Sequence, residues 1–284
     1  MNNSTSDGSK KIRVIMESIH DPILTGGKFE VSPKISKDSF LNESYFDKRG
    51  ILVTQHTFNS KAVLTSTIRF KYDENQNNTE RISYKFDGSL VTKKVNKFDN
   101  ENRLIESHEL DERGKIVSKK TTHYDSAGFR IFSSYEWASH ASGLIRTLES
   151  VFDKNENNVA NLYFTDNNLV SKETNRYDEN GNLVEATQYN PLTGEQIIKQ
   201  CQYDEQNNKA GIVVFSNNLV NTKTIFKYDA KNNLIGISSY GVLGTLEAQR
   251  EYLYEFDAEG NWTKRIHIFN KKPISVLIRR IKYY

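Results

Sequence analysis

An aromatic residue followed by aspartate recurs along the chain and divides it into segments of nearly equal length. The nine pairs begin at Phe46, Tyr72, Phe98, Tyr124, Phe152, Tyr177, Tyr203, Tyr228 and Phe256. Successive pairs lie 25 to 28 residues apart, most often 26. A fixed period of this length is the signature of a repeat protein, so each segment is expected to form one supersecondary unit.

Each aromatic–aspartate pair precedes residues that favour a tight turn. Three residues after the aspartate, seven copies carry Gly or Asn; the other two carry Gln76 and Glu156, each followed by Asn, as if slipped by one position. Aspartate accepts hydrogen bonds from turn amides, and Gly or Asn tolerates the positive φ needed next. We therefore expect a hairpin turn in each copy, with representative turn residues Asp178, Gly181, Asp257 and Gly260.

Between the turns, each repeat is predicted to contain two short strands. A second aromatic residue follows eight of the nine aspartates after 10 to 12 residues, and a looser turn follows it. By strict alternation, Leu183 of NLVEATQY (182–189) shares a face with Glu185 and Tyr189. Both faces of such strands carry polar groups, which argues against a sandwich with a dry core and favours one curved sheet.

These patterns predict an all-β protein. We expect an antiparallel β-meander of nine hairpin repeats, about 18 strands of ordinary length, that curves or spirals into a shell. Residues 46–284 would form these repeats as one domain, residues 11–45 an N-terminal cap or degenerate repeat, and residues 1–10 a polar disordered tail. The two open ends of the sheet could pair between copies and give an edge-to-edge homodimer.

The motifs YDENGNL (177–183), YDAKNNL (228–234) and FDAEGNW (256–262) resemble the tyrosine–aspartate (YD) repeats of the Rhs family. The resemblance covers about residues 45 to 284. It implies a bacterial β-sheet shell, which in some members encloses a toxic domain and in others stands at the cell surface, and it implies a link to carbohydrate binding. The period is longer than usual, Gly-Asn stands where Gly-Arg is common, and no Rhs core or effector segment follows. We therefore expect a short stand-alone member without the toxin-delivery role.

Composition adds little about function. The net charge of +3, with both signs interspersed, does not favour nucleic acid as a partner. No run of 18 apolar residues is present, so no membrane span is expected. The single cysteine, Cys201, excludes an intrachain disulfide. The protein would be cytoplasmic if Met1 is the native start, and otherwise periplasmic, cell-surface or secreted after loss of a leader.

No catalytic pattern is recognisable. The six histidines do not pair with each other or with cysteine at a metal-ligand spacing, and GxSxG, P-loop and dinucleotide motifs are missing. The recurring aspartates fit turn capping better than calcium binding, which needs several carboxylates per loop. We expect no catalytic residues, no metal and no cofactor, and a protein that is not an enzyme.

Basic residues gather near the end of the chain. After Glu259 there are no acidic residues and seven basic ones: Lys264, Arg265, Lys271, Lys272, Arg279, Arg280 and Lys282. Together with Trp262 they could form a partner-binding edge, or they could protect an open edge strand from aggregation. Trp262 and Trp137 could stack on a sugar or could fill space in the core.

The predicted function is a non-enzymatic binding or scaffold module for a protein or a glycan. One alternative is an accessory or immunity protein of a bacterial toxin system, which would need a charged patch matched to one toxin. Another is a glycan-active hydrolase, which would need clustered carboxylates or histidines with perturbed pKa values.

Overall fold

The computed structural model describes residues 10–25, 28–35, 41–138 and 144–284, and every regular element in this part of the chain is a β-strand. The expected tail lies, apart from Lys10, outside the described residues. The strands are β1 (Ile12–Thr25), β2 (Lys28–Ile35), β3 (Leu41–Phe46), β4 (Leu52–Phe58), β5 (Leu64–Tyr72), β6 (Asn78–Lys85), β7 (Leu90–Phe98), β8 (Leu104–Leu110), β9 (Ile116–Tyr124), β10 (Arg130–Ala138), β11 (Ile145–Phe152), β12 (Asn158–Thr165), β13 (Asn168–Tyr177), β14 (Leu183–Tyr189), β15 (Gln196–Tyr203), β16 (Lys209–Ser216), β17 (Leu219–Tyr228), β18 (Leu234–Tyr240), β19 (Leu246–Phe256), β20 (Trp262–Phe269) and β21 (Lys272–Tyr283).

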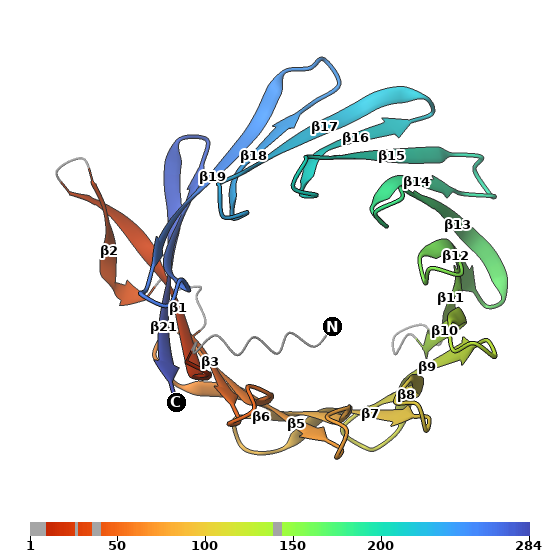
Figure 1. The fold of residues 1–284 in the computed structure, drawn as a ribbon, viewed down its shortest axis with the longest axis horizontal. Coiled ribbons are helices and arrows are strands. Elements are labelled where there is room, and N and C mark those ends of the chain that lie inside the picture. The colour runs from red at the N-terminus through yellow and green to blue at the C-terminus, as the bar shows by residue number, and fades with distance from the viewer. Residues whose placement is uncertain (1–9, 26–27, 36–40, 139–143) are drawn as a thin grey trace. The chain divides into compact units, whose positions relative to one another are not determined.

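Packing divides the chain into two compact units. The first comprises residues 1–72, 80–91 and 250–284; the second comprises residues 73–79 and 92–249. Within each unit, strands that follow one another along the chain pair antiparallel, as β3 does with β4 and β14 with β15. The β14–β15 hairpin can be followed in Figure 1. All 21 strands belong to one sheet.

The sheet is closed, and the expectation of an open curved or spiral meander is wrong. In the first unit, β1 pairs with β21 from Ile12 to His20 and with β3 from Val14 to Glu17. The first strand is thereby joined to the last, so 20 strands form a closed antiparallel β-barrel and β2, which pairs with β1, is an extra strand. Closure gives hydrogen-bond partners to edges that an open sheet leaves exposed. It also removes the two open ends on which the expected edge-to-edge homodimer depended.

The tight turns share one hydrogen-bond pattern. In the turn after Tyr177, Oδ1 of Asp178 accepts hydrogen bonds from the backbone N–H groups of Asn180 and Asn182, at 3.0 and 2.8 Å. Gly181 follows with a φ of 78°, in the left-handed region that glycine enters without strain. Gln76 and Glu156 also have positive φ, 66° and 61°. The two exceptional turns are therefore not slipped by one residue: a larger side chain occupies the same left-handed position.

A β-bulge follows each tight turn for which the pairing register is described. In one such hairpin, Tyr177 pairs with Leu183 whereas Arg176 pairs with Glu185, so Val184 is the extra residue. The bulge places Leu183 on the same face as Tyr177, and Glu185 on the opposite face. Strict alternation therefore assigned Leu183 to the wrong face.

The motif tyrosines connect neighbouring hairpins. Their hydroxyls donate hydrogen bonds, at 2.7 to 3.1 Å, to backbone carbonyl oxygens 19 or 20 residues earlier: Tyr72 to Leu52, Tyr124 to Leu104, Tyr177 to Asn158, Tyr203 to Leu183 and Tyr228 to Lys209. Phenylalanine cannot make this bond, which gives tyrosine at this position a structural role. We call the side of the sheet that carries these tyrosines the tyrosine face, and the other side the opposite face.

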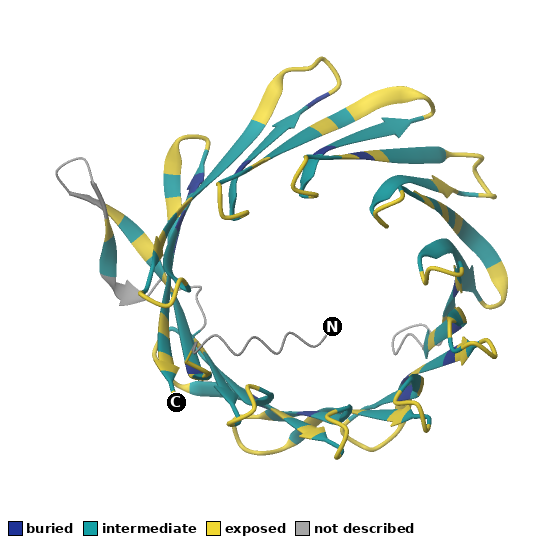
Figure 2. Ribbon diagram, viewed as in Figure 1, coloured by how far each residue is buried: buried dark blue, intermediate teal, exposed yellow. Residues whose placement is uncertain are grey.

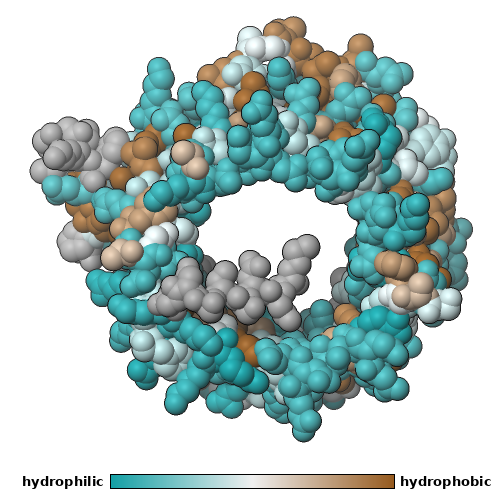
Figure 3. Space-filling view, viewed as in Figure 1, coloured by the Kyte–Doolittle hydropathy of each residue, from teal (hydrophilic) through white to brown (hydrophobic). Residues whose placement is uncertain are grey.

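Few side chains are fully buried, as expected for a single sheet. Figure 2 shows most strand residues at intermediate burial, and Figure 3 shows hydrophilic side chains over much of the visible surface. In the first unit, Ile266, Ile268 and Val276 form a small apolar cluster on the opposite face, and Val31 of β2 packs against it. On the tyrosine face of the second unit, several buried residues are polar, among them Ser118 and Ser133. Cys201 is buried and unpaired.

Candidate functional site

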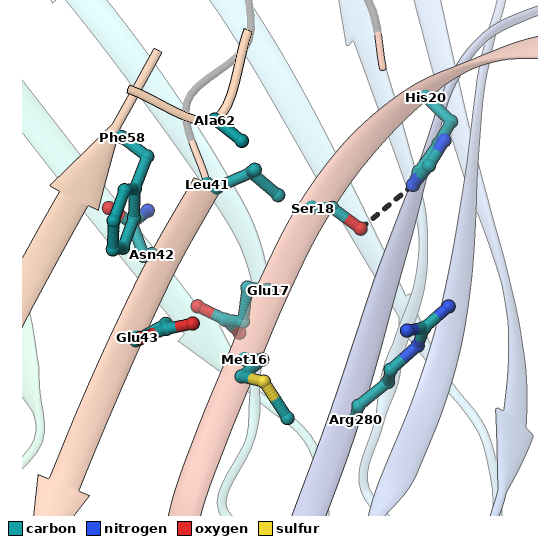
Figure 4. A pocket seen from close by; sticks show the side chains of 10 residues that line it. All are labelled: Met16, Glu17, Ser18, His20, Leu41, Asn42, Glu43, Phe58, Ala62 and Arg280. Atoms are coloured by element: carbon teal, nitrogen blue, oxygen red, sulfur yellow. Dashed lines mark hydrogen bonds between the residues drawn. The ribbon is translucent and has the colours of Figure 1, made fainter. Parts of the chain in front are cut away.

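A groove in the first unit is the main candidate site. It lies on β1, β3, β4 and β21 and has a volume of about 540 Å³, within the roughly 300–1,000 Å³ typical of small-molecule sites. Figure 4 shows the ten residues that line it: Met16, Glu17, Ser18, His20, Leu41, Asn42, Glu43, Phe58, Ala62 and Arg280.

Strand register explains how the groove is built. Met16, Ser18 and His20 are two residues apart on β1 and therefore point to one face. Met16 lies opposite Glu43 of β3 on one side and opposite Arg280 of β21 on the other. The groove thus depends on the pairing of β1 with both neighbours. The same register places it on the opposite face of the sheet.

Ser18 and His20 are joined by a hydrogen bond. Ser18 Oγ lies 2.8 Å from His20 Nε2 (Figure 4). His20 Nδ1 lies 2.9 Å from the backbone carbonyl oxygen of Ser32 on β2. A carbonyl oxygen can only accept, so Nδ1 carries a proton. In the neutral imidazole, Nε2 then accepts the hydrogen bond from the Ser18 hydroxyl. Both side chains are half-buried.

The groove is lined by three charged side chains, Glu17, Glu43 and Arg280, which differ in their surroundings. Glu17 pairs with Arg279 at 2.6 Å. Glu43 accepts a hydrogen bond of 2.6 Å from the hydroxyl of Tyr45, and this bond, together with burial and the carboxylate charge, raises the pKa of Tyr45. Arg280 is exposed and, among the described residues, makes no ion pair or hydrogen bond. It is therefore the group in the groove most available to an anionic or carbonyl oxygen.

The predicted basic edge is divided by the sheet. β21 is not an edge strand, because it pairs with β1 and β20. Trp262, Arg265 and Arg279 lie on the tyrosine face, whereas Lys264, Arg280 and Lys282 lie on the opposite face. Lys271 and Lys272 lie at the turn between β20 and β21. These residues do not form one patch, and binding by any of them stays a prediction.

Several of these residues have intramolecular partners. Lys264 pairs with Glu255 at 2.7 Å, and Arg279 pairs with Glu17 at 2.6 Å. The guanidinium of Arg279 also lies 3.6 Å from the ring centroid of Trp262, with Arg265 at 5.5 Å from the same ring. The indole therefore makes cation–π contacts within the protein, which compete with stacking on a sugar.

The second unit holds an aromatic platform, of which the sequence singled out only Trp137. Tyr135 and Trp137 of β10 have ring centroids 5.1 Å apart and a tilt of 30°. Lys120 of β9 lies directly opposite Tyr135, and Arg146 of β11 directly opposite Trp137. All four side chains therefore point to the tyrosine face. We use "aromatic platform" for these four residues.

The cations of the platform have little negative charge around them. Burial lowers the pKa of Lys120, and the positive charges of Arg130 and Lys94 lower it further. Neither Lys120 nor Arg146 has an ion pair or hydrogen bond within the described ranges. One carboxylate, that of Glu109, lies near the platform. It accepts a hydrogen bond of 3.4 Å from the hydroxyl of Ser118, and Ser118 lies directly opposite Trp137.

Metal coordination finds no support in the described part of the chain. There, no group of three or more His, Cys, Asp or Glu side chains is placed to hold a metal ion. No helix of the described residues is long and apolar enough to cross a membrane.

The comparisons with known proteins give structural likeness only. No protein-family model and no curated protein matches the sequence. Similar solved structures include the toxin complexes TcdB2-TccC3-Cdc42 (TM-score 0.39, 12% identity, 94% of this chain and 16% of that chain) and TcdB2-TccC3 without its hypervariable C-terminal region (0.40, 11%, 95% and 17%). Another is a porin-like protein from Bacteroides uniformis (0.34, 9%, 95% and 98%). This chain thus spans only about a sixth of the toxin chains.

The toxin complexes contain Rhs/YD repeats, which agrees in kind with the resemblance seen in the motifs. The expectation of no membrane span, in contrast, does not hold. It rested on the lack of an 18-residue apolar run, and that criterion detects helices. A closed sheet satisfies its own backbone hydrogen bonds and is the second kind of structure that can cross a bilayer.

Proposed function

We propose that the chain is a short stand-alone YD-repeat protein that acts as a binding module for a glycan or a protein. The nine motif copies, their common turn and the hydroxyl bonds between hairpins support the assignment to YD repeats. A repeat sheet of this kind holds side chains in regular rows, and such rows can bind a ligand without any catalytic step.

The aromatic platform is the observation that carries this proposal. Tyr135 and Trp137 are adjacent on one face of one strand, and tyrosine and tryptophan combine a large apolar surface with a polar group. Lys120 and Arg146 stand on the two neighbouring strands and are offset by two residues along them, which places their Cα atoms about 12 Å apart at ordinary strand spacing and rise. Stacking surface between two unpaired cations fits a sugar chain that carries carboxylate or sulfate groups. Glu109 in the adjacent row would repel a phosphodiester backbone and could accept sugar hydroxyls.

Tryptophan fluorescence gives a direct test. The chain has two tryptophans, so Trp262→Phe leaves Trp137 as the only reporter. This variant is titrated with a heparin hexasaccharide, a polygalacturonate hexamer and neutral cellohexaose. We expect the acidic oligosaccharides to change the emission of Trp137, and Lys120→Ala or Arg146→Ala to weaken binding by about tenfold or more, since a hydrogen bond to a charged group contributes roughly 1.5–3 kcal/mol.

Lys199→Ala is the matched control. Lys199 lies on the tyrosine face of β15, away from the platform, and its loss should leave the affinity unchanged. No response to any oligosaccharide, or equal loss with Lys199→Ala, would contradict the platform as a glycan site. Capture of a single protein at equal stoichiometry, with no glycan binding, would instead favour the accessory or immunity role in a toxin system.

A further inference from the structure

The groove of the first unit contains a reactive pair that the binding role does not use. We propose that it hydrolyses carboxylic esters, with Ser18 as the nucleophile and His20 as the general base. This goes beyond the proposed function and departs from the expectation that the chain is not an enzyme. The proposal uses the first unit only and is independent of the aromatic platform.

The hydrogen bonds set the roles of the two residues. A serine nucleophile needs a base within about 2.6–3.2 Å, and the base needs a third group that orients it. Ser18 Oγ is 2.8 Å from His20 Nε2, and the carbonyl of Ser32 fixes Nδ1–H at 2.9 Å. This carbonyl orients the imidazole ring, as the aspartate does in a Ser-His-Asp triad, but it carries no negative charge.

The remaining groove residues suit an ester. Met16, Leu41 and Phe58 supply apolar surface for a short acyl chain. Arg280 lies opposite Met16 and lines the same groove, and its guanidinium has no described partner. Figure 4 shows it on the side of β1 to which Ser18 and His20 point. A guanidinium in this groove, with no other described partner, is available to donate hydrogen bonds to the oxyanion that forms on the attacked carbonyl.

The chemistry balances with water as the only co-reactant. Ser18 Oγ attacks the ester carbonyl carbon and its proton passes to His20 Nε2, while the carbonyl electron pair moves to the oxygen beside Arg280. The tetrahedral species collapses, the C–O bond to the alcohol breaks, and the leaving alkoxide takes the proton from Nε2. Water then attacks the acyl-serine and gives a proton to Nε2. Collapse returns that proton to Ser18 Oγ and releases the carboxylic acid.

Two measurements test the proposal on the full chain. A fluorophosphonate probe should label Ser18, as shown by peptide mass spectrometry. Hydrolysis of para-nitrophenyl butyrate should fall by about 100-fold or more in Ser18→Ala and in His20→Gln, because general-base catalysis contributes about 10²–10⁴-fold. Ser275→Ala is the control, because Ser275 is a half-buried serine on the tyrosine face of β21 and should keep full activity.

Folding is controlled by near-ultraviolet circular dichroism of each variant. His20→Gln keeps an amide that can donate to Ser32, so it should fold even if His20→Ala does not. Absence of labelling and hydrolysis in the wild-type chain would overturn the proposal. So would labelling at another residue, or activity retained in Ser18→Ala. None of these results would affect oligosaccharide binding monitored through Trp137.

Discussion

The hydroxyl of Tyr72 donates a hydrogen bond of 2.7 Å to the backbone carbonyl oxygen of Leu52, 20 residues earlier in the chain. The same bond recurs in four further copies of the motif. Each of these tyrosines therefore ties the last residue of its own strand to the first residue of the strand that precedes it in the sheet.

Tyr72→Phe should destabilise the protein by about 1 kcal/mol, because a half-buried carbonyl loses its side-chain partner. Urea unfolding measures the change. Tyr189→Phe is the matched control, because Tyr189 is exposed and its hydroxyl has no described partner, so stability should stay within about 0.5 kcal/mol. Equal effects at the two positions would show that the hydroxyl bond does not contribute.

The tight turns predict opposite effects for exchanges between Gly and Gln. Gly181→Gln places a side chain at a φ of 78° and should cost about 1–2 kcal/mol. Gln76→Gly relieves the same strain at 66° and should stabilise the chain by up to about 1 kcal/mol. The expected cost of Gly181→Gln does not come from a steric clash, since the nearest atom to a Cβ at Gly181 would be 3.9 Å away. Thermal unfolding of both variants distinguishes the signs, and two changes of the same sign would contradict this account of the turn.

Acid should destabilise the protein through the turn aspartates. The side-chain amide of Asn182, followed by its backbone N–H, lowers the pKa of Asp178 below 3.8. The pKa is also lowered at Asp47, Asp73, Asp99, Asp153, Asp229 and Asp257. A carboxylate whose pKa is lower when folded binds fewer protons in the native state, so its contribution is present above pH 3.8 and is lost as the pH falls through the folded pKa.

The urea midpoint should therefore fall below about pH 4, and Asp178→Asn should make that fall smaller, because the variant has no carboxylate to protonate at this turn. Glu179→Gln is the control: Glu179 is an exposed neighbour whose removal should leave the acid dependence unchanged. A wild-type midpoint independent of pH between 5 and 2 would contradict the prediction.

The sequence predicts the local structure well because the turn chemistry is local. Asp178 and its equivalents need partners only two and four residues away, so their spacing reveals the hairpins. The bulge at Val184 is not visible in the same way, because it shifts the face assignment without changing the motif. Ser18 and His20 could have been found from their separation of two residues on a strand, although the partner at Ser32 could not.

Closure and the aromatic platform depend on non-local register. β1 carries no aromatic–aspartate motif, and its pairing with β21 joins residues more than 250 positions apart, which no repeat pattern specifies. Likewise, Lys120 and Arg146 reach the platform only through the register of three strands. The prediction of a basic edge near the C-terminus assumed that the last strand is an edge strand, whereas the sheet closes there.

Disulfide trapping tests the closure of the sheet most directly, because it reports whether β1 pairs with β21 of the same chain. The groove also depends on this pairing. Ile15 and Ile281 lie directly opposite each other. Opposed Cα atoms in an antiparallel pair are about 4.5–5.5 Å apart, within reach of a disulfide. In a Cys201→Ser background, Ile15→Cys with Ile281→Cys should oxidise to a monomer whose linked peptide joins positions 15 and 281, whereas Ile15→Cys with Leu277→Cys should not. Cross-linked dimers only, or no cross-link, would contradict the closed sheet.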